Sequence, residues 1–224
     1  SQVRHGVTVT TSPRVSRNIV LFLLCAGLAA CNPIAVKPEP AAEPVYDAGT
    51  RHPDAPLELE QFGRLGGPWD CSIYYLQQDG SWQPRTGGAR WTFSYALGGY
   101  AITDIWEPEP DEDYPGSIGM NMRVFDSKAG LWRIAWTTAD QARFDLYEAS
   151  DEDGDIIMWG QGTDHQVRVT FYNIRPEQFD WKYEFSASDD GTLWTEVARM
   201  KCLRPGMEPA VLNGSPATLA TGEE

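Results

Sequence analysis

A strict alternation of aromatic and polar residues recurs along the chain. In FDWKYEFS (residues 179–186) the aromatic residues occupy every second position: Phe179, Trp181, Tyr183 and Phe185. A period of two places successive side chains on opposite faces, so this segment predicts a β-strand with one buried face. The segments RWTFSYAL (90–97) and VRVTF (167–171) repeat the pattern. The chain is therefore predicted to be built largely from half-buried strands.

Short polar turns that contain glycine separate these strands, as at Asp79-Gly80, Asp153-Gly154 and Asp190-Gly191. The two signals together predict strands near residues 69–76, 81–84, 89–97, 100–107, 117–126, 131–137, 142–149, 155–162, 165–174, 179–187 and 192–203. No long helical segment intervenes, so consecutive strands are expected to pair as hairpins. Closure of such a sheet removes its free edges. We therefore predict an all-β fold, an antiparallel up-and-down meander of 8–11 strands closed into a barrel.

A short helix is predicted before the first strand. In LELEQFGRL, Leu57, Gln61 and Leu65 lie roughly on one face, and Asp54 can cap the beginning of the helix. Gly66 and Gly67 then end it.

An apolar segment near the start of the chain, residues 19–30, indicates a targeting signal. As a helix it would reach roughly 18 Å, well short of a hydrocarbon core of about 30 Å. Arg4, Arg14 and Arg17 precede it without any acidic residue, and small residues follow it. This order is typical of a secretion signal. The alternative, a buried N-terminal helix, is disfavoured because the segment has no polar face.

The end of this segment, LAAC (28–31), resembles the lipobox of bacterial lipoproteins. The resemblance implies that residues 1–30 are a signal peptide and that Cys31 carries the lipid anchor. Asn32 in the next position implies the outer membrane of the bacterial cell envelope, facing the periplasm. An ordinary signal peptide with an incidental cysteine is the alternative.

The composition on either side of the strands predicts the domain boundaries. Residues 31–55 are rich in Pro, Ala and Glu and lack apolar periodicity, which indicates a disordered tether. Residues 206–224 are small, polar and aperiodic, which indicates a disordered tail. The barrel is expected to occupy residues 56–205, an ordinary size for one domain.

The formal net charge is -14 at pH 7. A protein with this negative charge repels phosphate backbones and anionic lipid headgroups, so we expect no nucleic-acid partner. Membrane attachment is expected through the lipid anchor only.

Two cysteines remain for the barrel, Cys71 on the first predicted strand and Cys202 on the last. A closed meander makes these strands neighbours, so a disulfide is predicted. It would close a loop of roughly 130 residues and contribute on the order of 5 kcal/mol in the chain-entropy model. Two separate buried thiols are the alternative.

Three segments, FGRLGGPWDCSIYY, LGGYAITDIWE and MRVFDSKAGLWRIAW, resemble a lipocalin-like, or calycin, domain of an uncharacterised bacterial family. The resemblance covers about residues 56–205. It implies a pocket for a small apolar ligand inside the barrel, not a reaction.

The candidate ligand-binding residues are mostly aromatic: Trp91, Tyr95, Trp132, Trp136, Trp159, Trp181 and Arg168. Such aromatic side chains could line a cavity or fill a barrel too small for a ligand. An inward arginine, Arg143 or Arg168, could hold a ligand carboxylate.

Signals for catalysis are weak. His165 is the only histidine of the expected domain, which excludes a three-histidine zinc site within one chain. The acidic clusters at residues 107–116 and 151–155 lack the spacing of a calcium loop. We therefore expect no enzyme activity, no metal and no cofactor.

The predicted function is binding of a small apolar or amphipathic ligand within the barrel. Two alternatives stay open. One is an envelope interaction module with a filled core, and the other is a carbohydrate-binding module that uses exposed tryptophans.

Overall fold

The computed structural model describes residues 47–111, 116–162, 164–186, 188 and 192–207. The elements within this part of the chain are α1 (Leu59–Gly63), β1 (Gly67–Leu76), β2 (Trp82–Pro84), β3 (Ala89–Ala96), the short 3-10 helix η1 (Leu97–Gly99), β4 (Ala101–Pro108), β5 (Gly119–Asp126), β6 (Leu131–Thr138), β7 (Asp145–Glu152), β8 (Asp155–Gln161), β9 (Gln166–Tyr172), β10 (Gln178–Ser186) and β11 (Thr195–Leu203).

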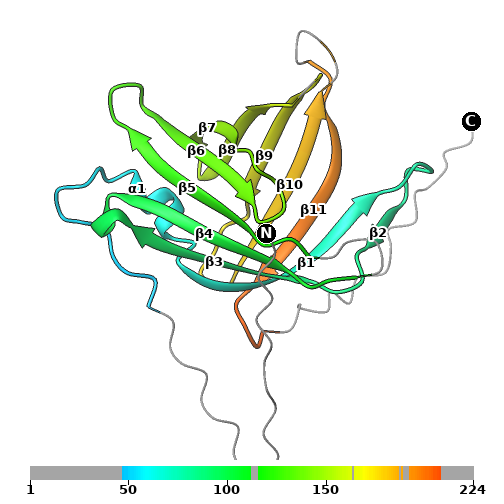
Figure 1. Ribbon diagram of the computed structural model, residues 1–224, viewed down its shortest axis with the longest axis horizontal. Helices are drawn as coiled ribbons and strands as arrows, with labels where there is room; N and C mark the ends of the chain where they lie inside the picture. The colour runs from blue at the N-terminus through cyan, green and yellow to red at the C-terminus, as the bar shows by residue number, and fades with distance from the viewer. Residues whose placement is uncertain (1–46, 112–115, 163, 187, 189–191, 208–224) are drawn as a thin grey trace, which may run out of the picture. The chain divides into compact units, whose positions relative to one another are not determined.

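The strands form one antiparallel sheet that follows the chain order and closes on itself (Figure 1). From β3 to β11 each strand pairs with the next, and β1 pairs with β3 on one side and with β11 on the other. The closed barrel therefore has 10 strands, and the predicted all-β meander of 8–11 strands is confirmed. The remaining strand, β2, pairs with the last residues of β1, and this hairpin extends away from the barrel (Figure 1).

The barrel closes where its first and last strands meet. The register between β1 and β11 runs from Asp70 opposite Leu203 to Tyr75 opposite Ala198. Within it Cys71 faces Cys202, and the two are joined by a disulfide with their Cα atoms 4.0 Å apart. The first and last strands of the barrel are therefore linked by a disulfide as well as by the backbone pairing of β1 with β11.

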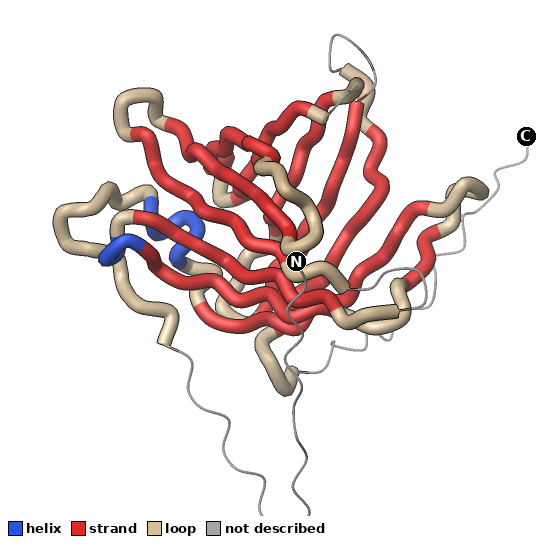
Figure 2. The backbone as a smooth tube through the Cα atoms, viewed as in Figure 1, coloured by secondary structure: helices blue, strands red, loops and turns tan. Residues whose placement is uncertain are grey.

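Helix α1 closes one end of the barrel, where it lies at the ends of the strands (Figure 2). Its Phe62 is completely buried and contacts the ring of Phe171 with centroids 5.8 Å apart. Leu59, Phe62 and Leu65 are completely buried, whereas Leu57 is 72% exposed, so Leu57 and Leu65 do not share one environment. The helix begins at Leu59 with no side-chain cap, so Asp54 does not cap it.

The same end of the barrel is sealed by Trp69 of β1. Its indole Nε1 donates to the carbonyl oxygen of Leu65 at 2.6 Å, and its ring meets Phe179 edge-on. The Arg204 guanidinium lies 3.6 Å from the centroid of the Trp69 ring and donates to the carbonyl oxygens of Pro68 and Pro176. Burial lowers the pKa of Arg204. The residues that follow β11 are thus tied back onto the start of β1.

Packing against the barrel begins before residue 56. The Tyr95 amide donates to the carbonyl oxygen of Ala48 at 2.8 Å, and the His52 amide donates to that of Gly99 at 3.0 Å. Gly99 has φ +91, and a Cβ there would lie 2.4 Å from the His52 nitrogen, so this close approach requires glycine. Residues 48–55 therefore belong to the domain and not to a tether.

The predicted signal peptide, the lipobox and residues 31–46 of the predicted tether lie outside the described residues, as do residues 208–224 of the predicted tail. Among the residues that are described, no helix has both the length and the apolar character needed to cross a membrane.

Candidate functional site: the barrel cavity

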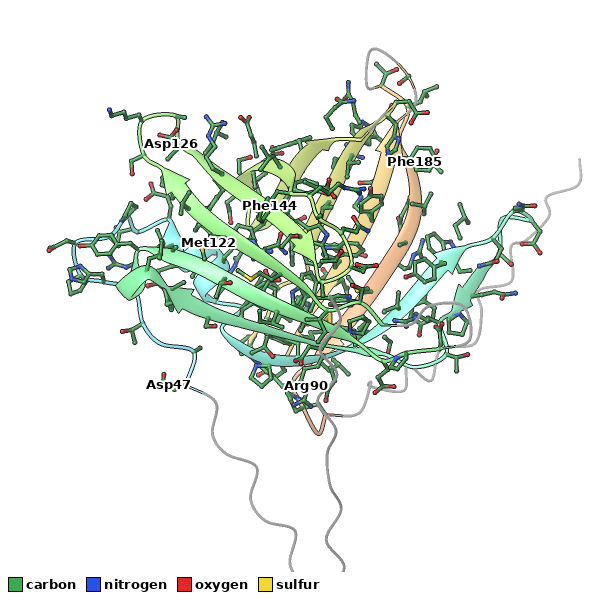
Figure 3. The ribbon with its side chains drawn as sticks, viewed as in Figure 1. Asp47, Arg90, Met122, Asp126, Phe144 and Phe185 are labelled. Carbon is green, nitrogen blue, oxygen red and sulfur yellow. A yellow bond between two sulfur atoms is a disulfide. The ribbon has the colours of Figure 1, made fainter. Side chains whose placement is uncertain are left out.

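The inward side chains leave a cavity of about 490 Å³ inside the barrel. Figure 3 shows side chains from the surrounding strands converging on this interior. The aromatic residues that border the cavity are Tyr75, Trp91, Trp106, Trp136, Tyr147, Phe171, Trp181 and Tyr183. Its aliphatic residues are Ile73, Leu76, Met158, Val169, Val197, Ala198 and Met200. Asn121 and Arg123 of β5 supply the polar part of the lining.

The cavity has a deep end and an outer end. Phe171 borders it next to α1, because its ring contacts Phe62 of that helix. Trp106, Trp136 and Tyr183 border it near the strand ends that lie away from α1. A ligand that enters from the outer end would therefore pass aromatic rings before it reaches the residues next to the helix.

A buried polar cluster lies at the deep end, on β4 and β5. Asp104 and Arg123 are completely buried, and Asn121 is nearly so. One carboxylate oxygen of Asp104 accepts hydrogen bonds from Trp91 Nε1 at 2.7 Å and from Asn121 Nδ2 at 3.1 Å. The other oxygen accepts a hydrogen bond from Arg123 Nη1. The Asp104 carboxylate thus has three donors.

Arg123 is much less well satisfied than Asp104. Its Nε and Nη2 atoms are buried without a hydrogen-bond partner among the described residues. Its guanidinium lies over the Phe62 ring at 4.6 Å from the centroid, which offers cation–π attraction but no acceptor in the plane of the group. Burial lowers the pKa of Arg123 to about 9, so the side chain remains charged at neutral pH. Each unsatisfied buried donor costs about 1–3 kcal/mol.

The sequence pattern did not predict Asn121 and Arg123 as cavity residues, because β5 turns its apolar side chains to the outside of the barrel. In GMNMRVFD, Met120 and Val124 alternate with Asn121 and Arg123. Hydrophobicity alone would bury the methionine face, yet Met120 is 37% exposed and Arg123 is completely buried. The neighbouring strand gives the correct phase, since Asn121 pairs with Asp104, and Asp104 lies on the same face of β4 as the buried Ile102.

Three of the predicted ligand-binding residues, Trp91, Trp136 and Trp181, border the cavity. Trp132 does not, because it is completely buried near α1 and its Nε1 donates to Gln61 Oε1 at 2.8 Å. Tyr95 also lies at that end, where its hydroxyl donates to Glu60 Oε2 at 3.1 Å.

The predicted arginines lie on the outer surface. Arg168 makes two hydrogen bonds to Glu184, at 2.8 and 2.9 Å, and its guanidinium stacks on Trp194 at 4.3 Å. Arg143 is exposed and pairs with Asp145. The arginine that borders the cavity is therefore Arg123, and neither Arg143 nor Arg168 does so.

Two glycines make room for aromatic rings around the cavity. A Cβ on Gly119 would lie 2.2 Å from Cη2 of Trp136, so the indole rests directly on the β5 backbone. A Cβ on Gly160 would lie 2.6 Å from Cδ1 of Tyr147. An alanine at Gly119 would therefore displace the ring of Trp136, and an alanine at Gly160 would displace the ring of Tyr147.

A second hollow, of about 510 Å³, lies against β6 to β9. Trp159, which is 36% exposed, and Trp194 border it together with the polar residues Arg133, Glu148, Gln161 and Gln166. The predicted ligand-binding residue Trp159 thus belongs to this outer hollow and not to the barrel cavity.

The described residues include no group of three or more His, Cys, Asp or Glu side chains placed to hold a metal ion. His165 Nδ1 lies 3.0 Å from Asp164 Oδ1, and the imidazole packs against the ring of Phe185. Asp151, from the second acidic cluster, pairs with Arg64.

A closed antiparallel meander of 10 strands, with one short helix at its end and an internal cavity, defines an up-and-down β-barrel. No protein-family model and no curated protein matches the chain. Among solved structures, the chain is similar to an S-type phycobiliprotein lyase, CPES, from Guillardia theta. The identity is 9% and the TM-score is 0.48, over 66% of this chain and 93% of that one.

Proposed function

We propose that the barrel binds a small, largely apolar or amphipathic ligand in its cavity. The observation that carries this proposal is a hollow of about 490 Å³ that is lined by aromatic and aliphatic side chains and has Asn121 and Arg123 at its deep end. Ligand pockets in proteins typically measure about 300–1,000 Å³ and combine an apolar lining with a few polar groups. A filled core, the alternative from the sequence, would leave no such volume.

The decisive experiment uses N-phenyl-1-naphthylamine, an uncharged apolar dye that becomes fluorescent when it leaves water. We expect saturable binding to the wild-type domain. Ala198→Trp, which adds an indole to a residue that borders the cavity, should weaken binding at least tenfold. Ala135→Trp on the outer side of β6 is the matched control and should bind as the wild type does. Equal binding by both variants, or no saturable binding by the wild type, would overturn the proposal.

The natural ligand can be identified by native mass spectrometry of the domain purified from its own source. A co-purifying small molecule that is lost from Ala198→Trp and retained by Ala135→Trp would name the ligand class. A molecule retained equally by both variants would be bound outside the cavity.

The outer hollow favours a second candidate function, binding of a saccharide. Trp159, which is 36% exposed, offers a ring face for stacking, and Gln161 and Gln166 offer amide groups for hydroxyls. Calorimetric titration with neutral oligosaccharides tests it. Binding that is lost in Trp159→Ala and kept in Trp181→Ala, which alters the barrel cavity, would support the outer site. The reverse pattern would contradict it.

We further propose that Cys31 is lipidated and that the lipid holds the barrel at the outer membrane, facing the periplasm. The support is the LAAC motif after a basic and then apolar segment. In cells that express the complete precursor, an alkyne-tagged fatty acid should label the protein, and detergent-free fractionation should place it with the outer membrane. Cys31→Ser should abolish the label, whereas Cys25→Ser should retain it. Labelling that survives Cys31→Ser would contradict the proposal.

A further inference from the structure

The deep end of the cavity offers hydrogen-bond donors without acceptors. Arg123 borders the cavity, and its Nε and Nη2 atoms have no partner among the described residues. A guanidinium carries N–H groups and no acceptor. A ligand that extends to this end would therefore gain most from an oxygen atom that accepts hydrogen bonds.

The positive charge at this end of the cavity is already neutralised within the protein. Arg123 is the charged residue among those that border the cavity, and its partner Asp104 is completely buried beside it. Trp91 and Asn121 both donate to Asp104, which favours the ionised carboxylate. A second carboxylate, brought in by a ligand, would face Asp104 in a site of low dielectric. Two buried like charges at short range repel strongly.

From these two observations we propose that the barrel prefers ligands whose buried end is an uncharged oxygen acceptor, such as an amide, ketone or ester carbonyl, over ligands that end in a carboxylate. This inference rests on the proposed ligand-binding function. An arginine without a buried carboxylate partner would favour the opposite choice, because it would leave a positive charge to be neutralised. Asp104 is thus the residue that sets the preference, although it acts through Arg123 and does not border the cavity.

The test uses two ligands of nearly identical shape, 2-naphthamide and 2-naphthoate, which differ in the charge of the head group. Each displaces N-phenyl-1-naphthylamine from the barrel at pH 7.5. We expect the wild-type domain to bind the amide at least tenfold more tightly than the carboxylate. Asp104→Asn keeps an oxygen acceptor for Trp91 and removes the negative charge, so this variant should prefer the carboxylate.

Glu107→Gln is the matched control, because it removes one carboxylate from the same strand at an exposed position. It should keep the wild-type ratio of the two affinities. Circular dichroism confirms that each variant is folded before its affinities are compared. If Asp104→Asn does not fold, the wild-type ratio alone decides the inference.

The outcomes separate the inference from the proposed function. Tighter binding of 2-naphthoate by the wild type, or an unchanged ratio in folded Asp104→Asn, would overturn the inference and leave ligand binding intact. If N-phenyl-1-naphthylamine and both naphthalene ligands fail to bind the wild type, the proposed function itself fails and the inference fails with it.

Discussion

Asp104 and Arg123 form an ion pair that is completely removed from water. Bringing two charges into an apolar interior costs free energy, and their attraction offsets that cost only where further hydrogen bonds satisfy both groups. Asp104 meets this condition through Trp91 and Asn121, whereas Arg123 keeps two unsatisfied nitrogens. At the residue scale the pair is therefore poorly explained by stability alone, and the two unsatisfied nitrogens of Arg123 are the feature on which the proposed ligand binding rests.

Removing one member of this pair should cost far more than removing both. Arg123→Met leaves the Asp104 charge buried without its partner, which should lower the free energy of unfolding by about 3–5 kcal/mol. Asp104→Asn with Arg123→Met should recover most of that loss, because no buried charge remains and Trp91 keeps an acceptor. Urea unfolding followed by tryptophan fluorescence measures both values.

Arg133→Met, at an exposed arginine, serves as the control and should change the free energy of unfolding by less than about 1 kcal/mol. A double variant as unstable as the single one would contradict this account.

The contact between Gly119 and Trp136 can be tested in the same way. Gly119→Ala should destabilise the domain by about 1–3 kcal/mol, because the new methyl group overlaps Cη2, Cζ2 and Cζ3 of the indole. In a Trp136→Phe background the smaller ring leaves space, so the same alanine should cost much less. A double-mutant cycle by urea unfolding measures this coupling. Equal costs in the two backgrounds would show that Trp136 does not lie against the Gly119 backbone.

At the scale of the elements, the strands were predictable because alternation and glycine turns act locally and agree with the final sheet. The helix was only partly predictable. With five residues, α1 is too short to be stable alone, so barrel contacts decide which of its faces is buried. The phase of β5 could not be obtained from its own hydrophobicity, since its inward polar residues Asn121 and Arg123 depend on Asp104 of β4 as their partner. The polar end of the site was missed for the same reason.

Helix α1 is held to β3 by the hydrogen bond from Tyr95 to Glu60, and this contact predicts a pH dependence. Burial, the hydrogen bond and the charge of Glu60 together raise the pKa of Tyr95 to about 12. An unfolded tyrosine has a pKa of about 10. The contribution of Tyr95 to stability should therefore be fully present below about pH 10 and be lost as the pH rises through the folded-state pKa near 12.

Absorbance at 295 nm as a function of pH measures this titration. The difference between the wild type and Tyr95→Phe isolates Tyr95 from the other tyrosines. In Glu60→Gln the pKa of Tyr95 should move down toward its ordinary value, because the negative charge is removed. Glu58→Gln, at the N-cap position two residues before Glu60, is the control and should leave the titration unchanged. A Tyr95 pKa that stays the same in Glu60→Gln would show that Glu60 does not act on it.

At the scale of the whole molecule, closure joins segments that are far apart in the sequence. Cys71 and Cys202 are separated by 131 residues, yet they face each other across the β1–β11 ladder. The sequence placed one cysteine on each terminal strand, and closure of a meander was enough to predict their proximity. The volume of the cavity was not predictable in this way, because aromatic side chains can fill a barrel as well as line one.

The disulfide should stabilise the barrel mainly by restricting the unfolded chain. For a loop of this length the chain-entropy model gives about 5 kcal/mol, and measured effects are usually about 2–5 kcal/mol. The double variant Cys71→Ala, Cys202→Ala should lose this much free energy of unfolding and still fold. The pairing of β1 with β11 and the packing of Trp69 against Phe179 also keep the barrel closed.

Urea unfolding measures this loss and should also give a larger m-value for the variant, since its unfolded chain exposes more surface. Dithiothreitol should shift the wild type toward the variant and leave the variant unchanged. Equal free energies of unfolding for the oxidised wild type and the variant would mean that the ladder alone determines closure.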